Sequence, residues 1–264
     1  MTQSNQIIGL LRFSYPSIGG FRKKHDTAEE AEAFLYDSAR LDRRMTLFER
    51  FTRPCLQNQT DPEFTMLILI GETMPQDAQA RLAAMVQDIP QVRILAYPSL
   101  PHYRAMRRAY DEVARNDATH RTTFRLDDDD AVDRDFIKRL RHWADKLADD
   151  APTAIAFNKG LYVDYTQNPP EIFDATEKTP LAVGTALTVP MDHPENIYRR
   201  NHRILAQFYN TFSEAETPCY IRTVHRDNGS DPAFTGRTRE MTQDEIAKIL
   251  KTQFDLTPDD LRRP

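Results

Sequence analysis

Four consecutive aspartates at residues 127–130 are the best candidates for chemistry in this chain. A β-favouring run at residues 122–126 leads into them, and an apolar segment with helical periodicity follows. Adjacent carboxylates repel one another and favour neither helix nor strand, so such a run at the end of a buried strand indicates a bound cation. Carboxylate oxygens suit Mg²⁺, Mn²⁺ or Ca²⁺. The alternative is a solvated acidic loop, which the apolar surroundings disfavour.

The segments around this run alternate between strand-like and helix-like patterns. Thr27 and Glu30 form a capping box at the start of the first predicted helix. This alternation predicts an α/β fold with an open, mostly parallel sheet flanked by helices. In such sheets ligands bind at the carboxyl ends of the strands, where Ser14, Glu72 and Asp127 fall. The predicted strands of this half are residues 6–13, 64–70, 92–96 and the run that enters the aspartates, and the later predicted helices include residues 103–113 and 136–147.

The second half of the chain is less regular. Its predicted strands are residues 154–157, 160–165, 181–189 and 219–224, with a helix over residues 195–212. Residues 160–165 are expected to pair with 154–157. We predict one domain over residues 1–236, followed by a C-terminal helical tail, residues 237–264, that forms an appendage.

The composition of the chain indicates the class of protein to which it belongs. The chain has 264 residues, of which 40% are hydrophobic and 28% charged, as expected for a globular domain with a sizeable core. The net charge of −5 gives no general reason to expect a nucleic-acid partner. No apolar run approaches the roughly 20 residues needed to span a bilayer, and the N-terminus does not look like a signal peptide. Cys55 and Cys219 form no metal-type spacing, so a reducing, cytoplasmic compartment is expected.

Three further segments are considered together with the aspartate block FRLDDDD of residues 124–130. They are residues 12–14 (RFS), 54–64 (PCLQNQTDPEF) and 221–228 (IRTVHRDN). With these segments the chain resembles the GT-A glycosyltransferases, and more closely the bacterial proteins described as putative rhamnosyltransferases, over about residues 7–230. The resemblance implies a GT-A-like sheet with a smaller mixed C-terminal portion on the acceptor side. It also implies transfer of a sugar from a nucleoside diphosphate donor.

The resemblance implies a metal ion, Mn²⁺ or Mg²⁺, at the aspartates. A divalent ion between the donor diphosphate and the carboxylates stabilises the charge that develops as the glycosidic bond breaks. In an extended stretch Asp127 and Asp129 point to the same side, so metal contact is assigned to Asp129 with Asp127 as its helper. By resemblance His225 is the third ligand; the alternative is a surface histidine in a polar loop.

The nucleotide sugar is expected at the strand ends. Phe13 and Ser14 follow the first strand, where GT-A proteins hold the nucleotide; Phe13 either packs on the base or lies in the core. Arg104 is the arginine expected to reach the nucleotide from its helix, and Asp128 is expected to face the ribose or the sugar. The full set of nucleotide-sugar contacts implied by the resemblance is Arg12, Phe13, Ser14, Glu72, Arg104, Asp127, Asp128 and Asn228.

An inverting transfer also needs a general base for the acceptor hydroxyl. Asp192, His193 and Glu195 follow the segment expected to face the acceptor, and Asp192 is the preferred candidate. The acceptor is expected to be a cell-envelope glycan or glycolipid. The expected location is the cytoplasm or the inner face of the membrane, with peripheral contact and no transmembrane segment.

Other classes of protein remain possible on these residues. A metal-dependent phosphohydrolase can use an aspartate cluster, but an aspartate nucleophile is expected after the first strand, where this chain has residues 12–14 (RFS). A non-catalytic nucleotide-sugar-binding protein can keep the fold without turnover. A structural Ca²⁺ site is disfavoured because four adjacent aspartates contain no glycine or spaced oxygen ligands.

Overall fold

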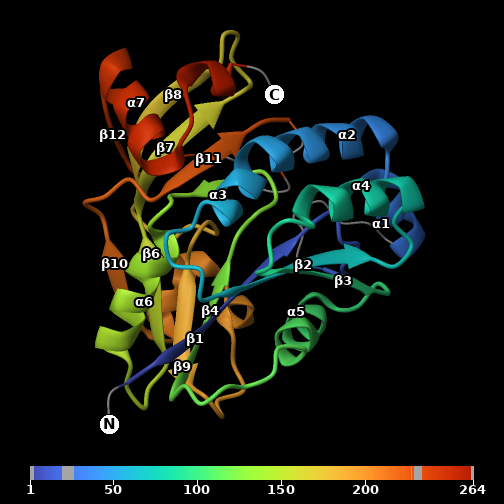
Figure 1. The fold of residues 1–264 in the computed structure, drawn as a ribbon, viewed down its shortest axis with the longest axis vertical. Helices are drawn as coiled ribbons and strands as arrows, with labels where there is room; N and C mark the ends of the chain where they lie inside the picture. Colours follow the sequence, from blue (N-terminus) through green and yellow to red (C-terminus); the bar gives the residue numbers. More distant parts are fainter. Residues whose placement is uncertain (1–2, 20–26, 227, 229–233, 263–264) are drawn as a thin grey trace.

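The computed structural model describes residues 3–19, 27–226, 228 and 234–262. Its larger sheet contains seven strands, which run in the spatial order β10-β6-β9-β4-β1-β2-β3 (Figure 1). Strands β3, β2, β1 and β4 are parallel, β9 is antiparallel to β4 and β6, and β10 is parallel to β6. The strands are β1 (Asn5–Arg12), β2 (Thr65–Gly71), β3 (Val92–Tyr97), β4 (His120–Arg125), β6 (Thr153–Phe157), β9 (Ala186–Pro190) and β10 (Asn210–Glu214).

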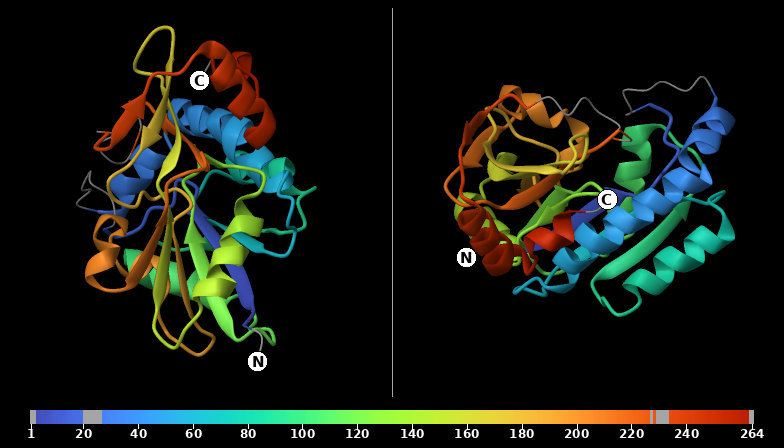
Figure 2. Two further views of the ribbon diagram at one scale, coloured as in Figure 1. Left: turned by 90° about the vertical axis from the view of Figure 1, so that its left-hand side faces the viewer. Right: turned by 90° about the horizontal axis from the view of Figure 1, so that it is seen from above.

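Helices cover both faces of this sheet (Figures 1 and 2). Because side chains alternate along a strand, Ile8 and Leu10 of β1 share a buried cluster with α5, whereas Ile7 and Leu11 lie in the larger core with α2, α4 and α6. The helices are α1 (Ala28–Leu35), α2 (Ser38–Leu47), α3 (Arg53–Gln57), α4 (Gln76–Val86), α5 (His102–Asp111), α6 (Phe136–Leu147) and α7 (Gln243–Ile249); single turns are η1 (Phe48–Thr52), η2 (Ile197–Arg199), η3 (His202–Gln207), η4 (Leu250–Phe254) and η5 (Pro258–Leu261).

A smaller sheet lies beside the carboxyl end of β4. Its strands, in the order β12-β8-β7-β11-β5, are β5 (Ala131–Val132), β7 (Lys159–Asp164), β8 (Glu171–Thr176), β11 (Tyr220–Val224) and β12 (Arg237–Arg239). β5 follows the aspartate run directly and pairs antiparallel with β11, with Ile221 opposite Ala131. This pairing brings the residues that follow β11 to the aspartates. The predicted fold class, a mostly parallel α/β sheet with a smaller mixed portion, is confirmed.

The strand–helix alternation predicted for the first half is confirmed, but three predictions for the second half are wrong. Residues 160–165 do not pair with 154–157; only Asn158 separates β6 from β7, too short a connection for a hairpin turn, and β7 joins the smaller sheet. The strand predicted from residue 181 begins only at Ala186, after Gly184 with φ of 71°. Asn196 and Asn201 cap two short turns where one long helix was predicted, followed by β10.

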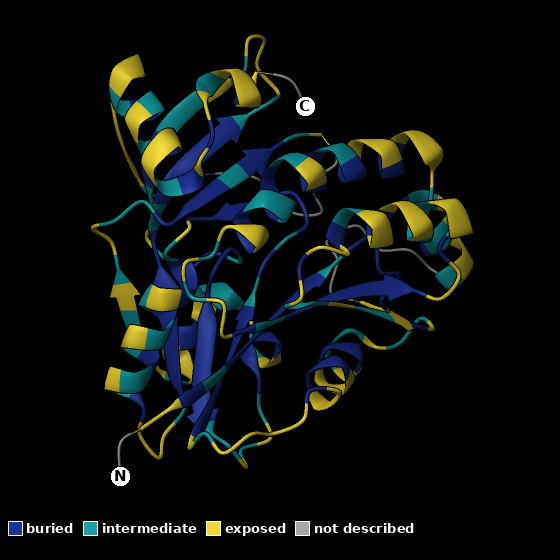
Figure 3. Ribbon diagram, in the orientation of Figure 1, coloured by how far each residue is buried: buried dark blue, intermediate teal, exposed yellow. Residues whose placement is uncertain are grey.

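The C-terminal region is part of the core. The helix predicted at Thr242 is present as α7, with both hydrogen bonds of its capping box. β12 adds to the edge of the smaller sheet at β8, and Ile246, Leu250 and Leu261 are buried in the larger core (Figure 3). Residues 237–262 therefore do not form the expected appendage, because their apolar side chains complete the packing. In the described ranges no helix has the length and apolarity to cross a membrane.

Candidate functional site

The aspartate run forms a turn at the carboxyl end of β4. β1, β2 and β4 are parallel neighbours of one sheet, so Ser14, Glu72 and Asp127 follow strands that end at the same edge, as predicted. The Asp130 N–H donates to the Asp127 carbonyl at 3.4 Å, which closes the turn. The alternation expected of an extended stretch therefore does not apply to residues 127–130.

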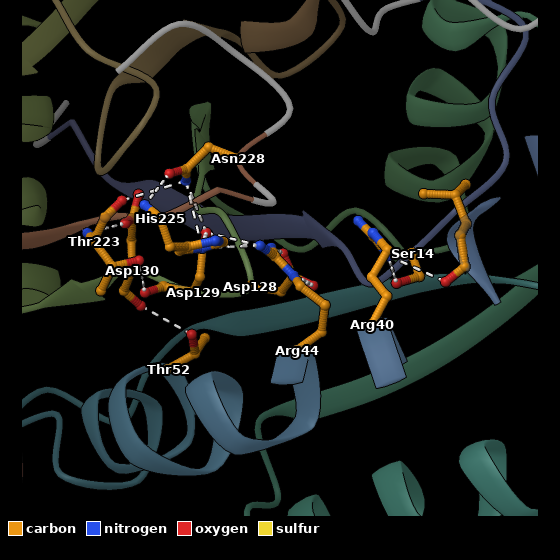
Figure 4. Close-up of polar contacts among 11 residues, drawn as sticks. Ser14, Arg40, Arg44, Thr52, Asp128, Asp129, Asp130, Thr223, His225 and Asn228 are labelled. Atoms are coloured by element: carbon orange, nitrogen blue, oxygen red, sulfur yellow. Dashed lines mark hydrogen bonds and ion pairs between the residues drawn. The ribbon is translucent and has the colours of Figure 1, made fainter. Parts of the chain in front are cut away.

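Arg44 of α2 provides the main counter-charge for the aspartates (Figure 4). Its Nε donates to Asp128 Oδ2 at 3.1 Å, its Nη2 donates to Asp128 Oδ1, and its Nη1 donates to Asp129 Oδ2 at 2.8 Å. All three side chains are buried. Sequence reasoning missed Arg44, because helical spacing identifies the inward face of α2 but not which carboxylate a residue on that face meets.

Asp129 joins α2 to the segment after β11. His225 Nε2 lies 2.7 Å from Asp129 Oδ2, and Asn228 Nδ2 donates to the same oxygen at 3.2 Å. The Oδ1 of Asn228 accepts from the backbone N–H of His225 at 2.5 Å, which holds the Asn228 side chain against the His225 backbone. Burial alone would raise the pKa of Asp129, but Arg44 and His225 hold it well below its ordinary value. Asp129 is therefore ionised.

Asp130 has a different role. The Thr223 N–H donates to Asp130 Oδ1 at 2.9 Å, and the Thr52 hydroxyl donates to the Asp130 carbonyl at 2.9 Å. Burial, with the neighbouring charges of Asp129 and Asp127, raises the pKa of Asp130 well above its ordinary value. These contacts tie the run to η1 and β11, so Asp130 fixes the position of the turn.

Asp127 is the half-buried member of the run. Among the described residues its carboxylate accepts no hydrogen bond and forms no ion pair. Its charge acts on two arginines, since it helps to raise the pKa of Arg222 and opposes the lowering of the Arg12 pKa by burial. Its oxygens are therefore available to a ligand or an ion at the edge of the sheet.

The candidate metal ligands are residue types that bind divalent cations, but their present side-chain contacts must rearrange before they can bind one. Across the described ranges, no group of three or more His, Cys, Asp or Glu side chains is arranged to hold a metal. Asp129 Oδ2 meets Arg44, His225 and Asn228 together, so an ion at this oxygen requires some of those contacts to open. Two carboxylates and an imidazole suit Mn²⁺ or Mg²⁺, and the guanidinium of Arg44 shows that the position accepts a positive charge.

The two residues after β1 both lie on the α2 side of the sheet. Phe13 is fully buried and packs edge-to-face on Phe48, with ring centroids 5.6 Å apart, so it is a core residue and not a platform for the base. The Ser14 hydroxyl accepts from Arg40 Nη1 at 2.9 Å on the α2 side. Ser14 has φ of 48°, a left-handed conformation that is uncommon outside glycine and typical of constrained sites.

Two of the predicted nucleotide contacts, Glu72 and Arg104, are exposed at the border of the site. Glu72 is exposed at the end of β2, where its N–H donates to the Tyr97 carbonyl. Arg104 is exposed on α5 and makes no polar contact in the part of the chain that the structure describes. Both side chains are free to meet a nucleotide, and neither is held in place for it.

Asp192 lies at the wrong end of the sheet for a general base at the aspartate run. β9 is antiparallel to β4, with Ala186 opposite Phe124 and Pro190 opposite His120. The chain therefore leaves the aspartates as it approaches Asp192, and four paired residues alone separate the ends by roughly 13 Å. Asp192 is also exposed. The prediction assumed that the segment after residue 187 leads towards the site, and the strand direction reverses this.

A second group of basic residues lies on the α5 side of the same edge, and the prediction included only Arg12 of them. Arg12 Nη1 lies 3.4 Å from His102 Nδ1, and Arg125 Nη1 lies 3.5 Å from His202 Nδ1. The Arg125 guanidinium also sits 4.7 Å from the Tyr198 ring centroid. The segment that carries Tyr198 and His202 returns to the site as η2 and η3, a path that the predicted helix concealed.

Both histidines are kept neutral. Burial, together with Arg12 and Arg125, lowers the pKa of His102 to about 3. Burial, together with Arg125 and Arg203, lowers the pKa of His202 to about 2. The α5 side of the edge therefore carries its positive charge on arginines, with neutral imidazoles between them.

Comparison with solved structures finds similar chains at low sequence identity. TarS residues 1–349 of S. aureus, in complex with UDP, is 11% identical, with a TM-score of 0.45 over 83% of this chain and 60% of TarS. A protein of Desulfovibrio desulfuricans described as a "putative nucleotide-diphospho-sugar transferase" is 9% identical, with a TM-score of 0.37 over 84% of this chain and 81% of that chain. The chain thus spans about 60% of the length of the TarS fragment. No curated protein matches it.

Comparison with family models gives a match over most of the chain. The model described as "Putative rhamnosyl transferase" matches residues 6–237, from the start of β1 to the start of β12. This range contains all the segments on which the resemblance rested. The chain belongs to the putative rhamnosyl transferase family.

Proposed function

We propose that this enzyme transfers a sugar from a nucleoside diphosphate donor to a hydroxyl of a cell-envelope glycan or glycolipid, with the help of a divalent metal ion. The observation that carries the proposal is the meeting of Asp129, His225, Asn228 and Arg44 at the carboxyl ends of β1 and β4. Three separate parts of the chain supply these side chains. Such convergence on one ionised carboxylate is typical of a site that handles charge.

In this proposal Asp127, Asp129 and His225 hold Mn²⁺ or Mg²⁺. The ion, when bound, neutralises the diphosphate as it leaves the sugar. Arg44 holds Asp128 and Asp129 in place in the absence of the ion, and its guanidinium can donate to a phosphate oxygen once those contacts open. Asn228 is bonded to the His225 backbone and is proposed to be within reach of the same phosphates.

The nucleotide is proposed to lie on the α2 side of the edge, beside Ser14. Arg40 holds the Ser14 hydroxyl there, and Glu72 and Arg104 at the rim are proposed to read the base or the ribose. Asp128 is proposed to face the ribose or the sugar once Arg44 turns to the diphosphate. The acceptor is proposed to approach from the cytoplasm or from the inner face of the membrane, by peripheral contact.

A thermal-shift screen tests the proposal. UDP, GDP, dTDP and CMP are each added with and without Mn²⁺ to the wild type, to Asp129→Ala and to Asp192→Ala. Binding to the folded state at a hundredfold excess over Kd adds about 2.7 kcal/mol of stability. We expect one diphosphate to give a Mn²⁺-dependent shift that is lost in Asp129→Ala.

Asp192→Ala is the matched control, because it removes an exposed aspartate at the opposite end of the sheet. Its shift should equal that of the wild type. If no diphosphate shifts the wild type, or if Asp129→Ala keeps the full metal-dependent shift, the donor-site proposal is wrong. Stabilisation by Mn²⁺ alone would favour a structural metal or a hydrolase.

A further inference from the structure

Five basic side chains gather near the carboxyl ends of β1 and β4, on the α5 side of the sheet, and we call them the α5-side cluster. They come from five different elements: Arg12 (β1), His102 (α5), Arg125 (β4), His202 (η3) and Arg222 (β11). The Tyr198 ring lies among them, 5.6 Å from the His102 ring and 4.7 Å from the Arg125 guanidinium. A set drawn from so many elements is a built arrangement rather than a charged surface of one helix.

Within the described residues, no carboxylate pairs with the guanidinium of Arg125. Arg125 forms no ion pair there, and its Nε is buried without a hydrogen-bond partner. Arg222 Nη1 donates to the neutral Tyr162 hydroxyl at 2.9 Å. The charges of Asp130 and Asp127 both act on Arg222, and the charge of Asp127 also acts on Arg12. Keeping the Arg125 guanidinium partly out of water without a counter-ion is costly, so an anion is its expected partner.

The two histidines add donors to the same space. A guanidinium can only donate, so Nδ1 of His102 and of His202 must accept from Arg12 and Arg125, respectively. Each neutral ring then carries its proton on Nε2. The cluster therefore presents guanidinium and imidazole N–H groups together, a donor set that recognises oxyanions.

Building on the transfer proposed above, we infer that the α5-side cluster binds an oxyanion of the acceptor, a phosphate or carboxylate group near the hydroxyl that receives the sugar. Planar guanidinium forks match both groups through paired hydrogen bonds. The proposed donor contacts, Arg40, Arg44 and Ser14, lie on the α2 side of the same strands. Asp127 follows β4 at this edge, so the donor diphosphate and the acceptor oxyanion can approach it from opposite faces, while Arg104 of α5 is proposed to reach only the base or ribose at the border of the site.

The test is calorimetric titration of inorganic phosphate, and separately of D-glucuronate, into the full chain without metal or nucleotide. Arg125→Gln and His202→Gln remove two members of the cluster. Arg44→Gln removes the donor-side arginine, and Arg121→Gln is the matched control, a buried arginine of β4 at the opposite end of the sheet. We expect Kd to rise roughly tenfold in Arg125→Gln and several-fold in His202→Gln, with Arg121→Gln unchanged.

A second arm distinguishes the acceptor oxyanion from a donor phosphate. The titrations are repeated with saturating UDP, GDP or dTDP and Mn²⁺. Undiminished binding of phosphate or glucuronate supports the acceptor subsite, whereas competition assigns the cluster to the donor and overturns the inference. Loss of binding in Arg44→Gln but not Arg125→Gln, or no binding of either anion by the wild type, also overturns it. If no diphosphate binds but the Arg125 dependence holds, the oxyanion site stands and the donor proposal fails.

Discussion

At the carboxyl ends of β1 and β4, the α2 side and the α5 side of the sheet differ in how buried charges are paired. On the α2 side Arg44 is paired with Asp128 and Asp129, and every partner has a hydrogen bond. On the α5 side Arg125 has neutral neighbours, His202 and Tyr198, and no carboxylate partner in the described ranges. The first side is complete without a ligand, and the second is not. Stability should therefore depend on the first, and ligand binding on the second.

The largest effect is expected where the balanced charges are broken. Arg44→Met leaves Asp128 and Asp129 buried without their guanidinium, so the free energy of unfolding should fall by about 3 to 5 kcal/mol. Chemical denaturation of both proteins measures it. The control is Arg81→Met, which breaks the exposed pair with Asp42 and should cost less than about 1 kcal/mol. Equal losses in the two variants would mean that burial of the α2-side pair has no energetic consequence.

The second effect is a pH dependence that arises on the α5 side. His102 and His202 have folded pKa values lowered to about 3 and about 2, against about 6.5 unfolded. Below pH 6.5 the unfolded chain therefore binds protons that the folded chain does not, so the histidines' contribution is intact above pH 6.5 and falls as the pH drops. The upper limit is about 1.4 kcal/mol per pH unit for each histidine.

Denaturation between pH 7 and pH 5 measures this slope in the wild type and in the double variant His102→Gln/His202→Gln. The variant should have the flatter profile. The comparison of variants is needed because Asp130, with its raised pKa, acts in the opposite direction as the pH falls. His142→Gln, at an exposed position of α6, is the control and should keep the wild-type slope. If the double variant also keeps the wild-type slope of stability against pH, the two histidines are not buried as neutral groups.

The same contrast explains what the sequence could and could not predict. Apolar runs and capping boxes made several elements predictable, because their signals are local, as at residues 64–70 in the first half and Thr242 near the C-terminus. The pairing of β5 with β11, which brings His225 to Asp129, is non-local; only the family resemblance indicated it. Arg44 and Arg125 carried no signal, because an arginine is read from sequence as a solvated charge. The prediction that Asp192 lies near the aspartate run was wrong because the direction of a strand within the larger sheet cannot be inferred from the sequence of that strand alone.

The smallest effect has the opposite sign to the first. Arg125→Met removes a guanidinium that has no ionic partner in the described ranges, so the lost cation–π contact with Tyr198 competes with relief from desolvation. We expect the free energy of unfolding to stay constant or to rise by up to about 1 kcal/mol, while phosphate affinity falls. Denaturation and calorimetry on the same variant measure the two quantities. A loss of stability as large as that of Arg44→Met would show that Arg125 is a structural residue, and the two sides of the edge would then not differ in kind.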